Sequence, residues 1–197
     1  MGEQVMSKMQ EVEQKFPIKN AIKIIDKLDI IAKKIVTNQK QFDTYYMPAH
    51  KNYLEGDVVS EWLRLRETGM GQSDINYKCW LPYGAKIQNH CNEYQSAISD
   101  IEAVKKIFEA LGIAPIVKVF KIRNSWEYKN VEISLDSVEG LGDFIELEFL
   151  EEVEEQKIDD ILLLFKTILA ELGAETGLQD RRGYPYLALE HKLGRSL

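Results

Sequence analysis

Charged and apolar residues alternate along four separate segments of this chain. Two segments carry cations, Leu63-Arg64-Leu65-Arg66 and Phe120-Lys121-Ile122-Arg123, and two carry carboxylates, Glu132–Asp136 and Phe144–Glu148. Successive side chains of a β-strand point to opposite faces, so each segment predicts a strand with one apolar and one charged face. The fold must therefore bury the apolar faces and supply water or counter-charge to the others.

Two architectures accommodate such strands. An antiparallel sheet can place its apolar face in the core and its charged face in water. A closed barrel can instead direct the charged faces inward, with helices covering its apolar outside. The cations and carboxylates are sorted by strand rather than mixed, which favours the barrel. Because unpaired interior charge is costly, the lumen of that barrel must hold water and counter-charge.

Spacing and turn residues predict one α+β domain over residues 1–197, with seven or eight mostly antiparallel strands. No repeat and no Pro- or Gly-rich linker divides the chain. The strands are expected at residues 11–16, 39–46, 62–67, 75–81, 91–97, 117–124, 131–136 and 144–150.

Apolar residues at helical spacing predict three amphipathic helices. The first covers 17–36 and is closed by Asn38, and the second covers 99–111 and is capped by Ser99. The third covers 159–172. In the tail, residues 184–189 favour either a short helix or a packing segment.

The composition argues against several classes of protein. There are 25 basic and 32 acidic residues, and the net charge of -7 argues against a nucleic-acid binder or a membrane-surface protein. The two cysteines, Cys79 and Cys91, form no CxxC motif, which argues against structural zinc and favours a reduced cytoplasm. The longest apolar run, Ile161–Phe165, is too short to span a bilayer. The sequence leaves open whether the chain forms a homodimer.

A Glu-x-Glu-x-Lys motif occurs near the start of the chain, at Glu11, Glu13 and Lys15. On a strand these three side chains share one face. Two carboxylates in a row suit a hard divalent cation such as Mg²⁺, and the lysine suits a phosphate carried by that cation. Taken alone, the motif is more often a solvated strand edge, so the metal interpretation depends on the other charged strands.

A triphosphate with its divalent cations would supply the counter-charge that the lumen needs. The phosphate oxygens would be held by Arg64, Arg66, Lys78, Lys121 and Arg123, the arginines through paired donors. The metal would be held by Glu11, Glu13, Asp136, Glu146 and Glu148.

The chain resembles the CYTH superfamily, the triphosphate tunnel metalloenzymes, and within it the class IV adenylyl cyclase branch. The opening motif and a series of later segments match this family in order along the chain. The matching segments are Glu11–Lys15, Gln41–Tyr46, Leu63–Glu67, Tyr77-Lys78, Val119–Arg123 and, most tellingly, Leu135–Glu148.

This resemblance implies an eight-stranded antiparallel closed barrel, or tunnel, dependence on Mg²⁺ or Mn²⁺, and a nucleoside or organic triphosphate as substrate. We assign catalytic roles to Lys15, Glu13 and Glu146, and Lys15 also contacts phosphate. The first expected activity is that of a class IV adenylyl cyclase, which converts ATP into cyclic AMP and pyrophosphate. The alternative is a triphosphatase that hydrolyses thiamine triphosphate, inorganic triphosphate or another triphosphate. A non-catalytic polyphosphate-binding module is the third hypothesis.

One strand departs from the family pattern. Relatives carry an Arg and a second Glu there, whereas Asn92 and Gln95 stand near those positions in this chain. Glu93 is expected to keep the remaining acidic role. Arg181 and Arg182 either replace the missing cation or lie on the surface.

Overall fold

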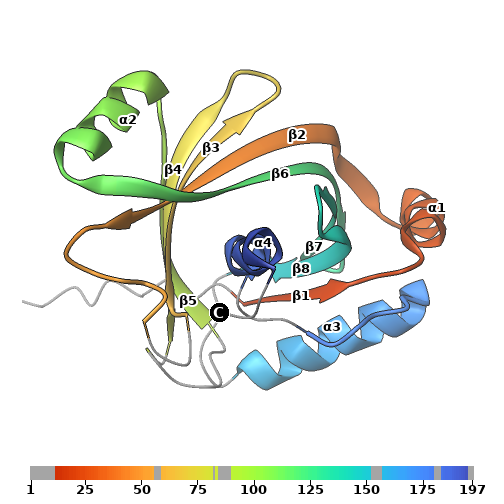
Figure 1. Ribbon diagram of the computed structural model, residues 1–197. Helices are drawn as coiled ribbons and strands as arrows, with labels where there is room; N and C mark the ends of the chain where they lie inside the picture. Colours follow the sequence, from red (N-terminus) through yellow and green to blue (C-terminus); the bar gives the residue numbers. More distant parts are fainter. Residues whose placement is uncertain are drawn as a thin grey trace, which may run out of the picture.

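The computed structural model describes residues 12–55, 59–81, 83, 90–151, 157–179 and 183–194. Eight strands and four helices are found within these ranges (Figure 1). In chain order they are β1 (Glu13–Pro17), α1 (Ala21–Ile31), β2 (Lys33–Pro48), β3 (Glu61–Thr68), β4 (Ser73–Leu81), β5 (His90–Ala97), α2 (Ile101–Ala110), β6 (Ile113–Tyr128), β7 (Val131–Val138), β8 (Gly142–Phe149), α3 (Ile158–Leu172) and α4 (Gly183–Leu193).

All eight strands belong to one antiparallel sheet. Their order across the sheet is β1-β8-β7-β6-β2-β3-β4-β5. The two longest strands, β2 and β6, pair with each other and join the two halves of the sheet. β6 and β7 form a hairpin whose two loop residues, Lys129 and Asn130, both have positive φ angles of 52° and 64°. Such a loop matches the right-handed twist of the strands that it connects.

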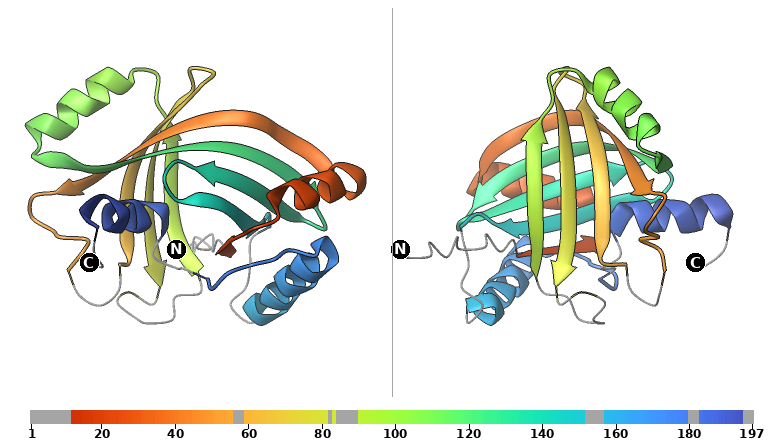
Figure 2. Two further views of the ribbon diagram at one scale, coloured as in Figure 1. Left: turned by 45° about the vertical axis from the view of Figure 1, so that its right-hand side comes forward. Right: turned by 90° about the vertical axis from the view of Figure 1, so that its left-hand side faces the viewer.

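The sheet curls around an interior space (Figure 2). Its edge strands are β1 and β5, and no backbone pairing joins them in the part of the chain that the structure describes. Side chains link the two ends of the sheet instead: Lys78 Nζ on β4 lies 3.0 Å from Glu13 Oε2 on β1. The eight antiparallel strands expected from the sequence are thereby confirmed, and they form a curled, tunnel-like sheet in which no backbone pairing of the described residues closes the barrel between β1 and β5.

Helices α1 and α3 cover the apolar outside of the β7–β8 region. Phe165 and Ile168 of α3 are fully buried and pack in one cluster with Ile133 of β7 and with Ile145 and Leu147 of β8. These strand residues alternate with the charged ones, so the apolar face is turned to the helices and the charged face to the interior. None of the helices within the described ranges is long and apolar enough to cross a membrane.

Helices α2 and α4 pack on different parts of the sheet. Phe108 of α2 packs against Tyr46 and Leu65 on the outside of β2 and β3. The tail folds into a helix, α4, whose Tyr184 packs in a cluster with residues that include Trp62. Figure 1 shows α4 nearly end-on within the outline of the curled sheet, and the right-hand view of Figure 2 shows it extending sideways beyond the strands. The short helix offered as one reading of the tail is therefore present, and it closes part of the interior.

The predicted helix over 17–36 is wrong in its second half. Helix α1 ends at Ile31, because Ala32 has extended backbone angles, and Lys33–Val36 pair with β6 as the start of β2. Isoleucines at helical spacing misled the prediction, since β-branched residues suit strands equally well and the long β6 offers backbone partners. Asn38 accordingly lies within β2 at a φ angle of 48°, and does not end a helix.

The predicted cap of the second helix is also wrong by one residue. The residue that caps α2 is Asp100, whose Oδ1 accepts a hydrogen bond of 2.9 Å from the backbone N–H of Ala103. Carboxylate and hydroxyl side chains both cap helix starts well. The adjacent Ser99 and Asp100 were therefore equally suited by residue type, and the backbone path decides between them.

Candidate active site

The interior of the tunnel holds a strongly charged cavity of about 310 Å³. Its cations are Lys15, Arg64, Arg66, Lys78, Lys121 and Arg123. Its carboxylates are Glu13, Glu93, Glu132, Glu146 and Glu148. The structure therefore brings together every phosphate-binding residue predicted from the sequence, from both halves of the curled sheet.

Two of the arginines are held in a fixed orientation by buried aspartates on neighbouring strands. Arg66 and Asp43 lie directly opposite each other on β3 and β2, and Arg123 and Asp136 do so on β6 and β7. Each pair shares two hydrogen bonds of 2.7 Å, one to each carboxylate oxygen. Both aspartates are 1% exposed. Paired donors of this kind fix the guanidinium plane as well as its charge, so these arginines are held in place before any ligand arrives.

The pKa values of both aspartates reflect these partners. Burial alone would raise the pKa of Asp43, but the hydrogen bond from Arg66 and the charge of Arg64 outweigh burial and lower it. Burial likewise opposes the charge of Asp136, but the charges of Arg123 and Lys121 hold its pKa well below the usual range. Both carboxylates are therefore ionised, and they balance cations that would otherwise repel one another.

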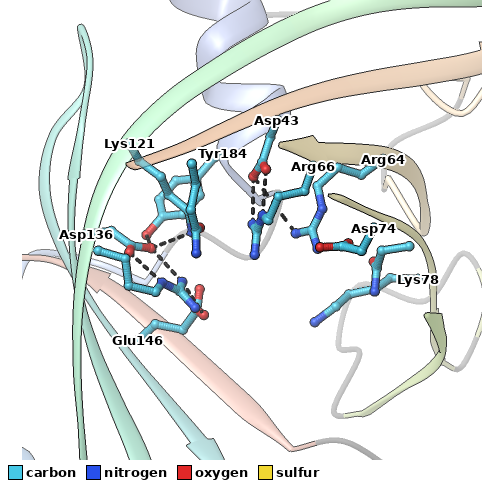
Figure 3. A network of polar contacts seen from close by, with 12 residues as sticks. Asp43, Arg64, Arg66, Asp74, Lys78, Lys121, Asp136, Glu146 and Tyr184 are labelled. Atoms are coloured by element: carbon cyan, nitrogen blue, oxygen red, sulfur yellow. Dashed lines mark hydrogen bonds and ion pairs between the residues drawn. The ribbon is translucent and has the colours of Figure 1, made fainter. Parts of the chain in front are cut away.

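Lys121 is the most deeply buried cation of the cavity, with an exposed fraction of 2%. Its Nζ lies 2.8 Å from Asp136 Oδ2 (Figure 3). Burial, with the nearby charge of Arg123 as the next cause, lowers its pKa from 10.5 to about 7. The ammonium is thus partly deprotonated near neutral pH, and an incoming anion would favour the protonated form.

The remaining three cations are held less tightly. Lys15 Nζ lies 3.4 Å from Glu146 Oε2, and Lys78 Nζ lies 3.0 Å from Glu13 Oε2. Arg64 reaches Asp43 and Asp74 only at 3.9 and 3.6 Å. Figure 3 shows Lys78, Arg64 and Arg66 on the side of the interior that faces Lys121 and Glu146.

A cluster of three carboxylates forms the best candidate for a metal site in the described part of the chain. Oxygens of Glu13, Glu146 and Glu148 all lie within 4.8 Å of one another. The register explains the cluster: Glu13 lies opposite Glu148 across β1 and β8, and Glu146 is two residues away on the same face. Oxygen ligands of this kind fit a hard divalent cation.

Two members of this cluster differ in charge state. Burial raises the pKa of Glu148 to about 7; Lys78 counteracts this, while the charges of Glu13 and Glu146 add to it. Burial also works against the charge of Glu146, but Arg123 and Lys15 hold its pKa well below the usual range. A divalent cation would relieve the repulsion within the cluster and favour the ionised form of all three side chains.

Asp136 does not join the carboxylate cluster. Its two oxygens accept hydrogen bonds from Lys121, from both Nε and a terminal nitrogen of Arg123, and from the hydroxyl of Tyr184 at 2.9 Å. The structure places it behind the cavity wall, among the cations. Glu11, the fifth predicted metal ligand, lies outside the described residues, as do Arg181 and Arg182.

Sequence reasoning missed several residues that shape the cavity. Asp43 lies in a matching family segment but was given no role, although its position opposite Arg66 follows once β2 and β3 are paired. The sequence around Tyr184 did not indicate a role for this residue. The centre of its ring lies 4.0 Å from Lys15 Nζ, and this contact joins residues that are far apart in the sequence.

On β5, Glu93 and Gln95 line the cavity. Glu93 accepts a hydrogen bond from the buried Asn76. Asn92 is the residue immediately before the cavity-lining Glu93, so its side chain belongs to the opposite face of the strand. Of the two departures from the family pattern, only Gln95 therefore bears on the cavity.

Known proteins share both the sequence pattern and the fold. The family model of the CYTH domain matches residues 9–184. A protein of Methanocaldococcus jannaschii named "Putative adenylate cyclase" is 34% identical over 140 residues, which are 71% of this chain and 77% of that protein.

Two solved structures have the same fold. A protein of Pyrococcus horikoshii OT3 is 31% identical, with a TM-score of 0.75 over 91% of this chain and 98% of that one. A Hippeastrum protein is 15% identical, with a TM-score of 0.61 over 95% of this chain and 97% of that one; it is described as a "putative adenylyl cyclase" that reveals a dominant triphosphatase activity. With the family model covering most of its length, the chain belongs to the CYTH family.

Proposed function

We propose that this protein is an enzyme that acts on a nucleoside or organic triphosphate in the tunnel, with Mg²⁺ or Mn²⁺. The observation that carries the proposal is the convergence of six cations and a three-carboxylate cluster on one cavity. A cavity with cations alone would suit any anion. Adjacent carboxylates are unfavourable for an anion unless a divalent cation accompanies it, which is the form in which triphosphates react.

The arginines and the lysines would contribute to phosphate binding in different ways. Arg66 and Arg123 present the remaining N–H groups of guanidinium planes that the buried aspartates have already fixed. Lys15 on β1, Lys78 on β4 and Lys121 on β6 add ammonium charges. Such a ring of donors can hold the phosphate chain along the tunnel and orient it relative to the carboxylates, which is the main task in phosphoryl transfer.

Glu13, Glu146 and Glu148 are the residues that would hold the divalent cation. When bound, that cation neutralises charge that develops on the phosphate oxygens. Lys15 lies beside this cluster and would stabilise the same charge from the other side. On this basis Lys15, Glu13 and Glu146 are the proposed catalytic residues.

The first candidate reaction is that of a class IV adenylyl cyclase. The ribose 3′ hydroxyl of ATP attacks the α-phosphorus, its proton leaves, and pyrophosphate departs. The Leu135–Glu148 segment, which resembles the cyclase branch, and the name of the Methanocaldococcus jannaschii relative support this choice.

The second candidate is a triphosphatase, in which water attacks the terminal phosphorus. The activity named for the Hippeastrum structure supports it, and the same set of cations serves both reactions. Which phosphorus lies beside the carboxylates decides between the two.

Product analysis tests the proposal directly. The protein is incubated with ATP and Mg²⁺ or Mn²⁺, and the products are separated. Cyclic AMP and pyrophosphate identify a cyclase, whereas ADP and phosphate identify a triphosphatase. Tight binding of triphosphates without turnover would identify a polyphosphate-binding module, and an absence of both binding and turnover with ATP, thiamine triphosphate and tripolyphosphate would contradict the proposal.

A further inference from the structure

Two of the three cluster carboxylates are paired with lysines of the cavity wall. Lys78 Nζ contacts Glu13 at 3.0 Å, and Lys15 Nζ contacts Glu146 at 3.4 Å. Glu146 also accepts a hydrogen bond of 2.8 Å from Arg123. The groups that would hold metal and the groups that would hold phosphate thus neutralise each other in this structure.

These lysine contacts differ from the paired hydrogen bonds that join Arg66 to Asp43 and Arg123 to Asp136. The carboxylates of Asp43 and Asp136 lie behind the cavity wall and bind their arginines through two bonds of 2.7 Å each. Each lysine makes one longer contact with a carboxylate of the cluster, and these side chains are 11–18% exposed. Lys78 Nζ also lies 3.5 Å from Glu93 Oε2, outside the cluster. A lysine ammonium is a point charge on a flexible stem, so it can change partner with little rearrangement.

We propose that Lys15 and Lys78 exchange partners when the site fills. A divalent cation takes the carboxylates of Glu13 and Glu146, and the two released ammonium groups take phosphate oxygens. Metal and triphosphate therefore bind cooperatively, because each ligand removes a competitor of the other, and the coupling is reciprocal. Without metal, Glu13 and Glu146 act as internal counter-ions that weaken anion binding. This exchange rests on the proposed function.

The sheet offers a matched control for Glu13. Glu13 on β1 and Glu132 on β7 lie directly opposite Glu148, one on each side of it. Both line the cavity, so a change to Gln removes one charge beside the same residue in each case. Glu13 is paired with Lys78, whereas within the described ranges Glu132 makes no ion pair and accepts a hydrogen bond from Ser134.

The test is tripolyphosphate binding by isothermal titration calorimetry in EDTA. Glu13→Gln should tighten binding on the order of tenfold, because a charge-assisted bond to Lys78 no longer has to be broken. Glu132→Gln should tighten it by less than about threefold, because it removes only a nearby charge in a wet cavity. Equal gains in the two variants would overturn the exchange alone. A wild-type protein that binds no tripolyphosphate, with or without Mg²⁺, would overturn the proposed function together with the exchange.

A second measurement approaches the exchange from the metal side and does not need a stable Glu13 variant. Lys78→Met should strengthen Mn²⁺ binding in phosphate-free buffer by several-fold, measured by electron paramagnetic resonance. Arg64→Met removes the same charge from the cavity, but its partners, Asp43 and Asp74, lie outside the carboxylate cluster. Equal Mn²⁺ affinity in the two variants would overturn the exchange.

Discussion

Arg123 on β6 and Asp136 on β7 lie directly opposite each other and share two hydrogen bonds of 2.7 Å, one to each carboxylate oxygen. The same carboxylate also accepts from Lys121 and Tyr184. One buried side chain therefore balances two cations of the cavity wall and ties the C-terminal helix to them. Its loss would leave two neighbouring cations without their shared counter-charge.

Asp136→Asn should lower the free energy of unfolding by about 3–5 kcal/mol, because breaking a buried pair leaves an uncompensated charge. Urea denaturation at neutral pH measures the change. Asp26→Asn on the exposed face of α1 is the control, and it should change stability by less than about 0.5 kcal/mol. A loss below about 1 kcal/mol for Asp136→Asn would show that Lys121 and Arg123 find other partners.

Tyr184→Phe isolates the hydrogen bond that α4 donates to Asp136. The ring stays, with its faces toward Lys15 and Lys121 at 4.0 and 5.0 Å, but the 2.9 Å bond is lost. We expect a loss of about 1–3 kcal/mol in stability, since a buried charged acceptor loses a donor. Tyr94→Phe, on the exposed outer face of β5, serves as the control in the same denaturation series. Matching midpoints for the two variants would contradict a role for this bond.

The alternation of charge along the strands was enough to predict the sheet and the inward-facing cations. It could not give the strand order, because β2 pairs with both β3 and the distant β6, and such pairing depends on the whole chain. For the same reason the sequence assigned Asp136 to metal: its spacing fits an acidic face, and only the pairing with β6 shows that Arg123 lies opposite.

Other parts of the molecule carried too little local signal. The segment Lys33–Val36 contains β-branched residues whose spacing fits the preceding helix, and its pairing with β6 decides its conformation. Tyr184 belongs to a helix in a tail that has no clear sequence pattern. Asp136, which accepts its hydrogen bond, is 48 positions away in the sequence, and Lys15, which lies over its ring, is farther away still. Local propensity cannot report contacts of that range.

Lys121 makes the binding of polyanions dependent on pH. Its pKa of about 7 lies below the ordinary 10.5, because the folded protein disfavours the ammonium. A bound triphosphate favours the ammonium and raises this pKa. Binding therefore takes up a proton at pH values between the pKa of the free protein and that of the complex, and it weakens as the pH rises through that range. Calorimetric titrations with tripolyphosphate at about pH 8.5, in buffers of different ionisation enthalpy, should show this uptake. Lys121→Met should abolish it, and equal uptake in variant and wild type would assign the proton to another group.

Lys78→Ala and Glu146→Ala should separate binding from turnover. Lys78→Ala removes a phosphate contact and should raise the dissociation constant for tripolyphosphate in EDTA by about tenfold. Glu146→Ala removes a proposed metal ligand and a counter-ion of Lys15, so it should bind tripolyphosphate in EDTA at least as tightly as the wild type, while metal-dependent turnover falls on the order of a hundredfold. Lys118→Ala, exposed on β6, is the control and should change neither. Lys78 and Glu146 face one cavity from opposite walls of the tunnel. Identical effects of the two substitutions on binding and on turnover would contradict the assignment of one to phosphate and the other to metal.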